Sequence, residues 1–213
     1  MIRREFIAAM VAGLTASWAK AAPHQQFPTE PRKRLAVSTY PFRAFITSSG
    51  NKPGMTLEAF AATIVKEFNV RGIEPWSHHF ESIEPDYVSK LKRGFDRAGV
   101  HAVNISVDIH ANLCGTAEER NEAYAQYKQW VEAARLLGSP SIRVHLPPAP
   151  MKADYINCAV DGLKRVADYG AQKNIVVNLE NDDPRTEDRF ASWRSSSGRI
   201  HLICVPCLIF AIR

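Results

Sequence analysis

Short apolar runs rich in β-branched residues alternate along this chain with longer segments whose apolar side chains recur every three or four positions. The first pattern predicts buried strands and the second predicts amphipathic helices. Strands are therefore expected at residues 35–40, 70–76, 100–107, 141–146 and 175–180. A helix is expected after each of the first four strands, which gives a repeating strand and helix unit.

Residues that begin and end helices support this division. Thr56 can cap the first helix, and Pro85 suits the first turn of the second, which Gly99 ends. Thr116 and Glu119 have the spacing of a capping box at the start of the third helix. The apolar face of the fourth helix consists of Ile156, Ala159, Val160, Leu163 and Val166.

Ionisable residues stand at the ends of four predicted strands, namely Glu74, Asp108, His145 and Glu180. They are 34, 37 and 35 residues apart, a separation typical of one strand-helix-strand step. This alternation predicts a parallel sheet covered by helices, either open and doubly wound or closed as a barrel. The turn after the first strand lacks the glycine pattern of nucleotide-binding open sheets. We therefore predict an α/β fold, an incomplete (β/α)8 TIM barrel with about five βα units.

The charge of the chain lies at its two ends. The formal net charge is +5, with a surplus of two basic residues in residues 1–21 and three in residues 191–213. Residues 22–190 contain 21 basic and 21 acidic side chains. A neutral body argues against a nucleic-acid partner, which needs a basic surface.

The N-terminal segment has the pattern of a signal peptide. Arg3 and Arg4 precede an apolar run of 14 residues, and Ala19 and Ala21 suit signal peptidase. The run is shorter than the ~20 residues that span a bilayer, so no stable membrane anchor is expected. We predict a twin-arginine signal at residues 1–21, the twin-arginine export machinery as a partner, and a periplasmic location. An ordinary secretory signal is the alternative, and residues 22–34 are predicted to be a linker.

Glu180 is the predicted catalytic residue and metal ligand. It directly follows an apolar strand, where a carboxylate is costly unless a cation or a donor meets it. A carboxylate in such a place can bind a divalent cation through oxygen.

A second cluster is predicted to bind substrate. Glu74, Trp76 and His79 combine a carboxylate, an aromatic wall and an imidazole, which together can orient a sugar. Adjacent histidines on a loop cannot both point inward, and we prefer His79 to His78. Tyr40 is predicted at the mouth of the site. His145 either faces the pocket or bonds to a neighbouring carbonyl. Asp108 and His110 rank below these residues because the pattern does not define the loop after them.

The cysteines contribute little to this interpretation. Cys158 falls on the fourth helix and is expected to be a small core residue. Cys204 and Cys207 have the spacing of a dithiol, but a zinc site needs a second pair of ligands.

The body resembles the sugar phosphate isomerase/epimerase family of xylose-isomerase-like barrels. The similar stretches are Leu35–Arg43, Gly72–Phe80, Ile142–Val144 and Val177–Asp182. The resemblance implies a divalent metal (Mn, Mg, Zn or Co) and makes Glu180 a metal ligand that also helps to move a proton next to a sugar carbonyl. It also implies further ligands, an aspartate, a histidine and a second glutamate, on strands six to eight, and this sequence has no such positions.

The barrel pattern covers residues 35–190 and stops there. A complete barrel needs about 250 residues, whereas residues 22–190 number 169. The tail at 191–213 is rich in serine, free of acids and then apolar. Read one base out of frame, the codons of residues 203–213 permit Leu-Arg-Ala-Leu-Pro-Asp-Phe-Cys-Asn-Ser, which is similar to the family's sixth strand. We interpret the tail as a product of a frameshift.

The resemblance implies a metal-dependent isomerase or epimerase of a sugar or keto-sugar, impaired by truncation and with little or no activity. The alternatives are a dehydratase of the same superfamily, an exported sugar-binding protein without catalysis, or a truncated barrel without function.

Overall fold

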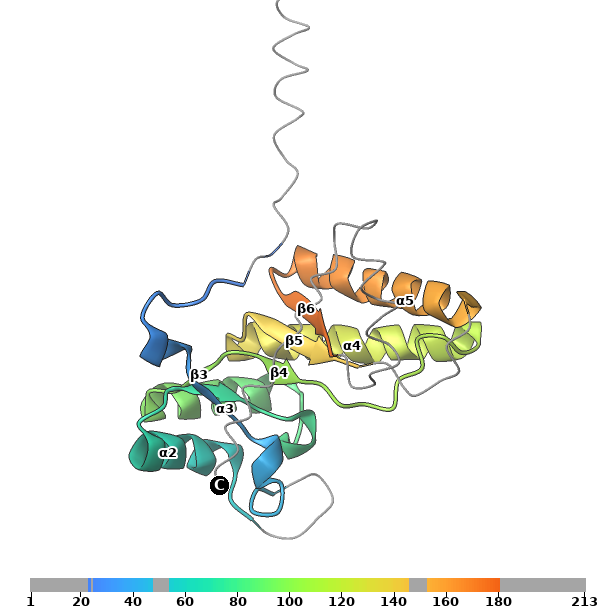
Figure 1. Cartoon of the computed structure of the whole chain (residues 1–213). Helices are drawn as coiled ribbons and strands as arrows, with labels where there is room; N and C mark the ends of the chain where they lie inside the picture. The colour runs from blue at the N-terminus through green and yellow to red at the C-terminus, as the bar shows by residue number, and fades with distance from the viewer. Residues whose placement is uncertain (1–22, 24, 48–53, 146–152, 181–213) are drawn as a thin grey trace, which may run out of the picture.

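The computed structural model describes residues 23, 25–47, 54–145 and 153–180 of the chain. The strands are β1 Ala36–Ser38, β2 Gly72–Glu74, β3 His101–Ala102, β4 Ile105–Ser106, β5 Ser141–Val144 and β6 Val176–Leu179. The α-helices are α2 Leu57–Phe68, α3 Pro85–Ala98, α4 Ala117–Leu137 and α5 Ala153–Gln172, and the 3-10 helices are η1 Pro31–Arg34, η2 Tyr40–Phe42 and η3 Ser77–His79. Figure 1 shows these elements.

The strands pair in parallel, in the orders β1-β2-β3 and β4-β5-β6. An isolated bridge between Trp76 and Ser106 continues the pairing of the first group into the second. Within the described residues the strands form an open arc, because β1 and β6 at its ends do not pair with each other. The observed architecture is thus a mixed α/β fold with an incomplete, unclosed barrel, as predicted.

The strand predicted at residues 100–107 is broken in two, which the pattern did not predict. Ile73 pairs with Ala102, an offset of 29 residues, whereas Trp76 pairs with Ser106, an offset of 30. The extra residue forms a β-bulge, which bends the strand and increases its twist. Consequently β3 pairs with β2 while β4 pairs with β5.

The predicted ends of the helices are confirmed. The Thr56 side chain accepts a hydrogen bond from the Ala59 amide, and Thr116 and Glu119 form both bonds of a capping box. Gly99 ends α3 with a φ of 69°, a left-handed conformation that glycine adopts without strain. These bonds satisfy backbone groups that helix ends leave without partners.

The helices cover one face of the arc and form its core with the strands. Successive helices pack in chain order, with α4 against β5 and α5 against β6 (Figure 1). The largest buried side chains come from both layers and include Ile64, Ile73, Phe95, Ile105, Tyr127 and Ile142. Among the described residues, no helix combines the length and the apolar character needed to cross a bilayer.

Several predictions fall wholly or partly outside the described residues. They concern the signal peptide at 1–21, the tail at 191–213 with Cys204 and Cys207, and the end of the strand predicted at 141–146. Within the predicted linker, Pro31–Arg34 forms η1.

Candidate functional site

Three ionisable side chains come together at the carboxyl ends of neighbouring parallel strands. Asp108 follows β4, while His145 and Glu180 directly follow β5 and β6. Nε2 of His145 lies 2.7 Å from Oδ1 of Asp108, and its Nδ1 lies 4.0 Å from Oε2 of Glu180. Because parallel strands all end at one edge of a sheet, residues far apart in sequence form one polar row here. His145 thus faces this row, while its own carbonyl accepts a bond from the buried Tyr127 hydroxyl at 3.5 Å.

Asp108 is held by the loop that follows β2. Nε1 of Trp76 donates to Oδ2 of Asp108 at 3.3 Å, and the Asp108 amide donates to the Ser77 hydroxyl at 2.9 Å. The His78 ring stacks on Trp76 with ring centroids 4.4 Å apart, and its Nε2 bonds to the Asp108 carbonyl at 2.8 Å. Asp108 therefore contacts more of the candidate site residues than its low rank in the sequence pattern indicated.

The environment of Asp108 favours its ionised form. Burial by itself raises the pKa of a carboxyl group, but here the hydrogen bond and charge of His145, with the hydrogen bond from Trp76, outweigh burial and lower the pKa of Asp108. Asp108 is thus an anion that orients the His145 imidazole.

Glu180 forms an ion pair with Arg143 that the sequence pattern did not predict, and both side chains are about three quarters buried. A guanidinium nitrogen of Arg143 lies 2.5 Å from Oε1 of Glu180, and a second one donates to the Ser106 hydroxyl. Arg143 is on β5 and lies two residues before His145, which directly follows the strand, so the alternation of extended backbone directs both side chains to the same face. A charged residue inside an apolar strand was the signal in the sequence that could have revealed it.

His79 lies beneath the aromatic wall. Its side chain is buried, its Nδ1 lies 2.8 Å from the Thr39 hydroxyl oxygen, and its ring meets the Trp76 ring edge to face at 5.1 Å. Nε2 of His79 is buried without a hydrogen-bond partner among the described residues. Burial, with a smaller effect of His78, lowers the pKa of His79 to about 4. His79 is thus a neutral support of Trp76, and His78 contacts the same ring from its face.

Glu74 does not join the row around His145. Its Oε1 accepts from the side-chain Nδ2 of Asn104 at 2.8 Å, and the side-chain Oδ1 of Asn104 accepts from the Ser141 hydroxyl at 2.7 Å. Asn104 lies at the bulge between β3 and β4, so this chain of bonds spans the broken strand. Glu74 is therefore placed to hold the two parts of the sheet together.

Tyr40 lies at the exposed rim of the site. Its ring meets Trp76 edge to face with centroids 5.0 Å apart, and the Arg43 guanidinium lies 4.5 Å above it. The rings of Tyr40 and the half-buried Trp76 together form an apolar wall, which lies beside Asp108 because Trp76 bonds to that residue.

The donor set at Glu180 does not by itself fit a divalent ion. One of its carboxylate oxygens is paired with Arg143, and both oxygens of Asp108 have hydrogen-bond partners. Among the described residues, no group of three or more His, Cys, Asp or Glu side chains is arranged to hold a metal ion. The role of Glu180 as a metal ligand stays a prediction.

Comparison with known proteins places the chain in a family. The family model described as xylose isomerase-like TIM barrel matches residues 62–196, more than half of the sequence. None of the curated proteins matches the chain.

Solved structures share the fold at low sequence identity. A xylose isomerase domain protein from Planctomyces limnophilus is 18% identical, with a TM-score of 0.52 over 74% of this chain and 59% of that one. A D-psicose 3-epimerase from Clostridium cellulolyticum H10, solved with D-tagatose, is 13% identical, with a TM-score of 0.54 over 68% and 50%. A sugar phosphate isomerase/epimerase from Parabacteroides distasonis ATCC 8503 is 12% identical, with a TM-score of 0.52 over 75% and 55%.

The chain therefore spans between half and three fifths of the length of these structures. The arc of parallel strands, the helices that cover it and the family match agree with one another. The chain belongs to the family of xylose isomerase-like TIM barrels.

Proposed function

We propose that this protein is an isomerase or epimerase of a sugar or keto-sugar, in which Glu180 moves the proton on the carbon next to the carbonyl. The observation that supports this proposal best is the row of Asp108, His145 and Glu180 at the strand ends, beside an aromatic wall. Enzymes of this class need a base within reach of a C–H bond and groups that hold the sugar hydroxyls. Family membership supports the same chemistry.

We assign each residue of the site a separate role in substrate binding or proton transfer. Trp76 and Tyr40 offer an apolar face on which the C–H face of a sugar ring or chain can pack. Arg143 holds one oxygen of Glu180 and thereby orients the carboxylate that takes the proton. Asp108 orients His145 through Nε2, and we expect the imidazole to bind a hydroxyl of the substrate beside Glu180.

The divalent ion implied by the resemblance remains a prediction. Its remaining ligands would have to come from outside the described residues, so we assign no step to it. Assays with and without Mn, Mg, Zn or Co decide whether activity depends on it.

Proton exchange is the direct test of the proposal. The purified chain is incubated with ketohexoses in D2O, beginning with D-tagatose and D-fructose because epimerases of this fold were solved with them. We expect deuterium at the carbon next to the carbonyl, measured by NMR, and a loss of at least about 100-fold in rate in Glu180→Gln. Glu132→Gln, the same chemical change on α4, is the matched control and keeps its activity.

The same assay also tests the prediction that truncation leaves the chain with little or no activity. Exchange at any rate supports the proposed role of Glu180, provided that Glu180→Gln abolishes it. A chain that melts cooperatively but shows no exchange with any metal and sugar overturns it.

The second candidate is a sugar-binding protein without catalysis. It is favoured by the aromatic wall of Tyr40 and Trp76, on which a sugar can pack whether or not a reaction follows. Its signature is a sugar-dependent rise in Tm without any exchange, since a ligand that binds the folded state stabilises it.

A further inference from the structure

Two cysteines that are distant in sequence lie side by side. Cys114 is in the loop between β4 and α4, and Cys158 is in α5. The Cys114 thiol bonds to the Tyr155 carbonyl on α5 at 3.7 Å, while the Cys158 thiol bonds to the Leu113 carbonyl at 3.4 Å. Each thiol thus contacts the backbone beside the other cysteine, and the Cys158 side chain is close enough to raise the pKa of Cys114.

The two segments are held close by their backbones. A Cβ atom added at Gly162 of α5 would lie 2.9 Å from Cβ of Leu113, so only glycine permits this approach. On the other side, the Cys114 amide donates to the Asn112 side chain at 3.0 Å, and α4 begins directly afterwards at its Thr116 cap. The proximity of the thiols therefore follows from the packing of α5 on this loop.

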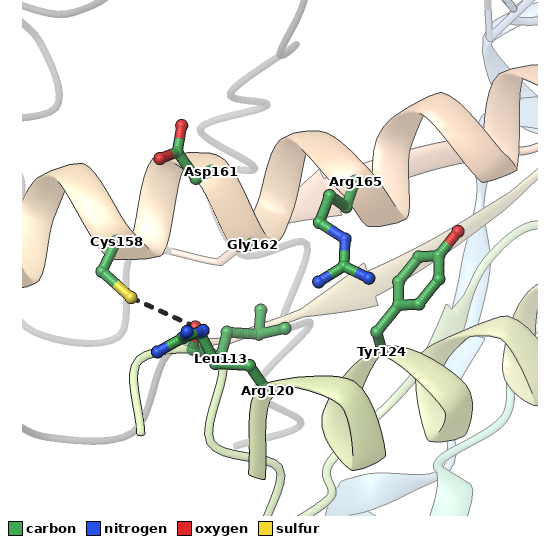
Figure 2. Close-up of a pocket in the computed structure, with 7 residues that line it drawn as sticks. All are labelled: Leu113, Arg120, Tyr124, Cys158, Asp161, Gly162 and Arg165. Atoms are coloured by element: carbon green, nitrogen blue, oxygen red, sulfur yellow. Dashed lines mark hydrogen bonds between the residues drawn. The ribbon is translucent and has the colours of Figure 1, made fainter. Parts of the chain in front are cut away.

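Cys158 borders a cavity, whereas the sequence analysis expected a core residue. The cavity has a volume of about 380 Å³ and is lined by Leu113, Arg120, Tyr124, Cys158, Asp161, Gly162 and Arg165. Figure 2 shows the Cys158 sulfur directed to Leu113, with the guanidinium groups of Arg120 and Arg165 on the same side of α5. Because two guanidinium groups and one carboxylate line the cavity, it favours the binding of an anion.

Cys114 and Cys158 are both partly exposed, but Cys158 lines the cavity and Cys114 is not among its lining residues. Burial and the hydrogen bond to Cys158 raise the pKa of Cys114 to about 12. A thiol in this state does not attack an oxidant by itself, because the thiolate is the nucleophile.

We propose that Cys114 and Cys158 are a redox-active pair, oxidised to a disulfide by thiol-disulfide exchange with a small anionic disulfide that enters the cavity at Cys158. The Cys158 thiol loses its proton to water, and its thiolate attacks one sulfur of the oxidant, forms a mixed disulfide and releases one thiolate of the oxidant, which takes up a proton from water. The Cys114 sulfur then loses its proton to water, attacks Cys158 and expels the second thiol. Two protein thiols are oxidised and one disulfide is reduced to two thiols.

Formation of the mixed disulfide itself prepares the second step. It removes the Cys158 thiol whose hydrogen bond and charge contribute to the raised pKa of Cys114. The product covalently connects the loop after Asp108 to the helix that precedes β6. This connection goes beyond the proposed isomerase activity and does not depend on it.

The experiment uses the full chain with Cys204→Ser and Cys207→Ser, so that only the proposed pair remains. The probe is oxidised glutathione, followed by alkylation, intact mass measurement and non-reducing peptide mapping. We expect a mass lower by two hydrogens, a peptide that contains both cysteines, no alkylation, and a Tm higher by several degrees that a reductant reverses. Folding keeps the thiols together, so their effective concentration is expected to be at least about tenfold higher in buffer than in urea.

Single variants in the same background test the assigned order. In Cys114→Ser, glutathione is expected to remain on Cys158, because no second thiol expels it. In Cys158→Ser, Cys114 is expected to stay unmodified in the folded chain and to react in urea, which shows that the thiol itself is competent. Equal effective concentrations in buffer and urea, alkylation of both cysteines after oxidation, or a disulfide only between two chains overturns the proposal.

Discussion

Individual residues at the site have distinct roles that follow from burial and from their partners. Glu180 and Arg143 form an ion pair in which both side chains are three quarters buried. Removal of one partner destabilises the folded protein, because it leaves the other charge without compensation. His79 is buried as a neutral imidazole, whereas Asp108 is an anion beside His145. The sequence located Glu180 and His145 at strand ends, and the charge of Arg143 inside an apolar strand indicated a buried partner, but the pairing of strands decided that this partner is Glu180.

His79 makes stability depend on pH. In the unfolded chain this imidazole binds a proton below about pH 6.5, but in the folded protein burial lowers its pKa to about 4. The unfolded state therefore binds more protons between these values, so stability is full above pH 6.5 and falls as the pH decreases toward 4. The shift corresponds to a loss of about 3 kcal/mol in the free energy of unfolding.

Urea unfolding between pH 7 and pH 4 checks this expectation. His79→Asn, whose amide can still bond to Thr39, should show a much flatter dependence on pH. His110→Asn, at an exposed position, serves as the control and should follow the wild type. Identical slopes for His79→Asn and the wild type would contradict the assignment.

At the scale of elements, a carboxylate connects α4 with α5. Oε1 of Glu132 accepts from the Tyr169 hydroxyl and pairs with Lys173, both at 2.6 Å, and Oε2 accepts from Arg135 at 2.8 Å. Lys173, then Tyr169 and Arg135, lower the pKa of Glu132 to about 2. The sequence predicted both helices from their apolar periodicity, but not which polar residues join them, since that depends on their relative rotation.

Glu132→Gln is expected to lower the free energy of unfolding by about 1 kcal/mol at pH 7, a modest value because the site is partly exposed to water. The contribution is present above the ordinary carboxyl pKa and is lost as the pH falls from about 4.5 toward 2. The difference between variant and wild type should therefore shrink in acid. Glu122→Gln on the same helix is the control and should have no measurable effect at either pH.

At the scale of the whole molecule, the broken strand couples the two parts of the sheet. The bulge places the buried Asn104 between Glu74 of β2 and Ser141 of β5. The periodicity of residues 100–107 predicted one continuous strand, because a single inserted residue barely changes the pattern of apolar positions. Only pairing with two neighbours in different registers shows the break.

Asn104→Leu is expected to reduce stability by about 2 kcal/mol, because it removes the hydrogen bond to the Glu74 carboxylate and leaves the Ser141 hydroxyl with the Val103 carbonyl as its partner. Hydrogen exchange should show faster exchange in both β2 and β5, since the residue connects both parts of the sheet. Thr47→Val, which removes a local hydrogen bond from the Gly54 amide, is the control. Faster exchange confined to one of the two strands would contradict the coupling.

The sequence by itself determined the elements, their order and the parallel strand-helix repeat, because hydrophobic periodicity and capping residues are local properties. It also placed ionisable residues at the strand ends, since each lies within two residues of an apolar run. The tertiary structure alone decided which of these residues meet. Glu74 bonds across the bulge while Asp108 joins His145, and Cys114 lies beside Cys158, because these contacts depend on register, twist and helix packing between residues 30 or more positions apart.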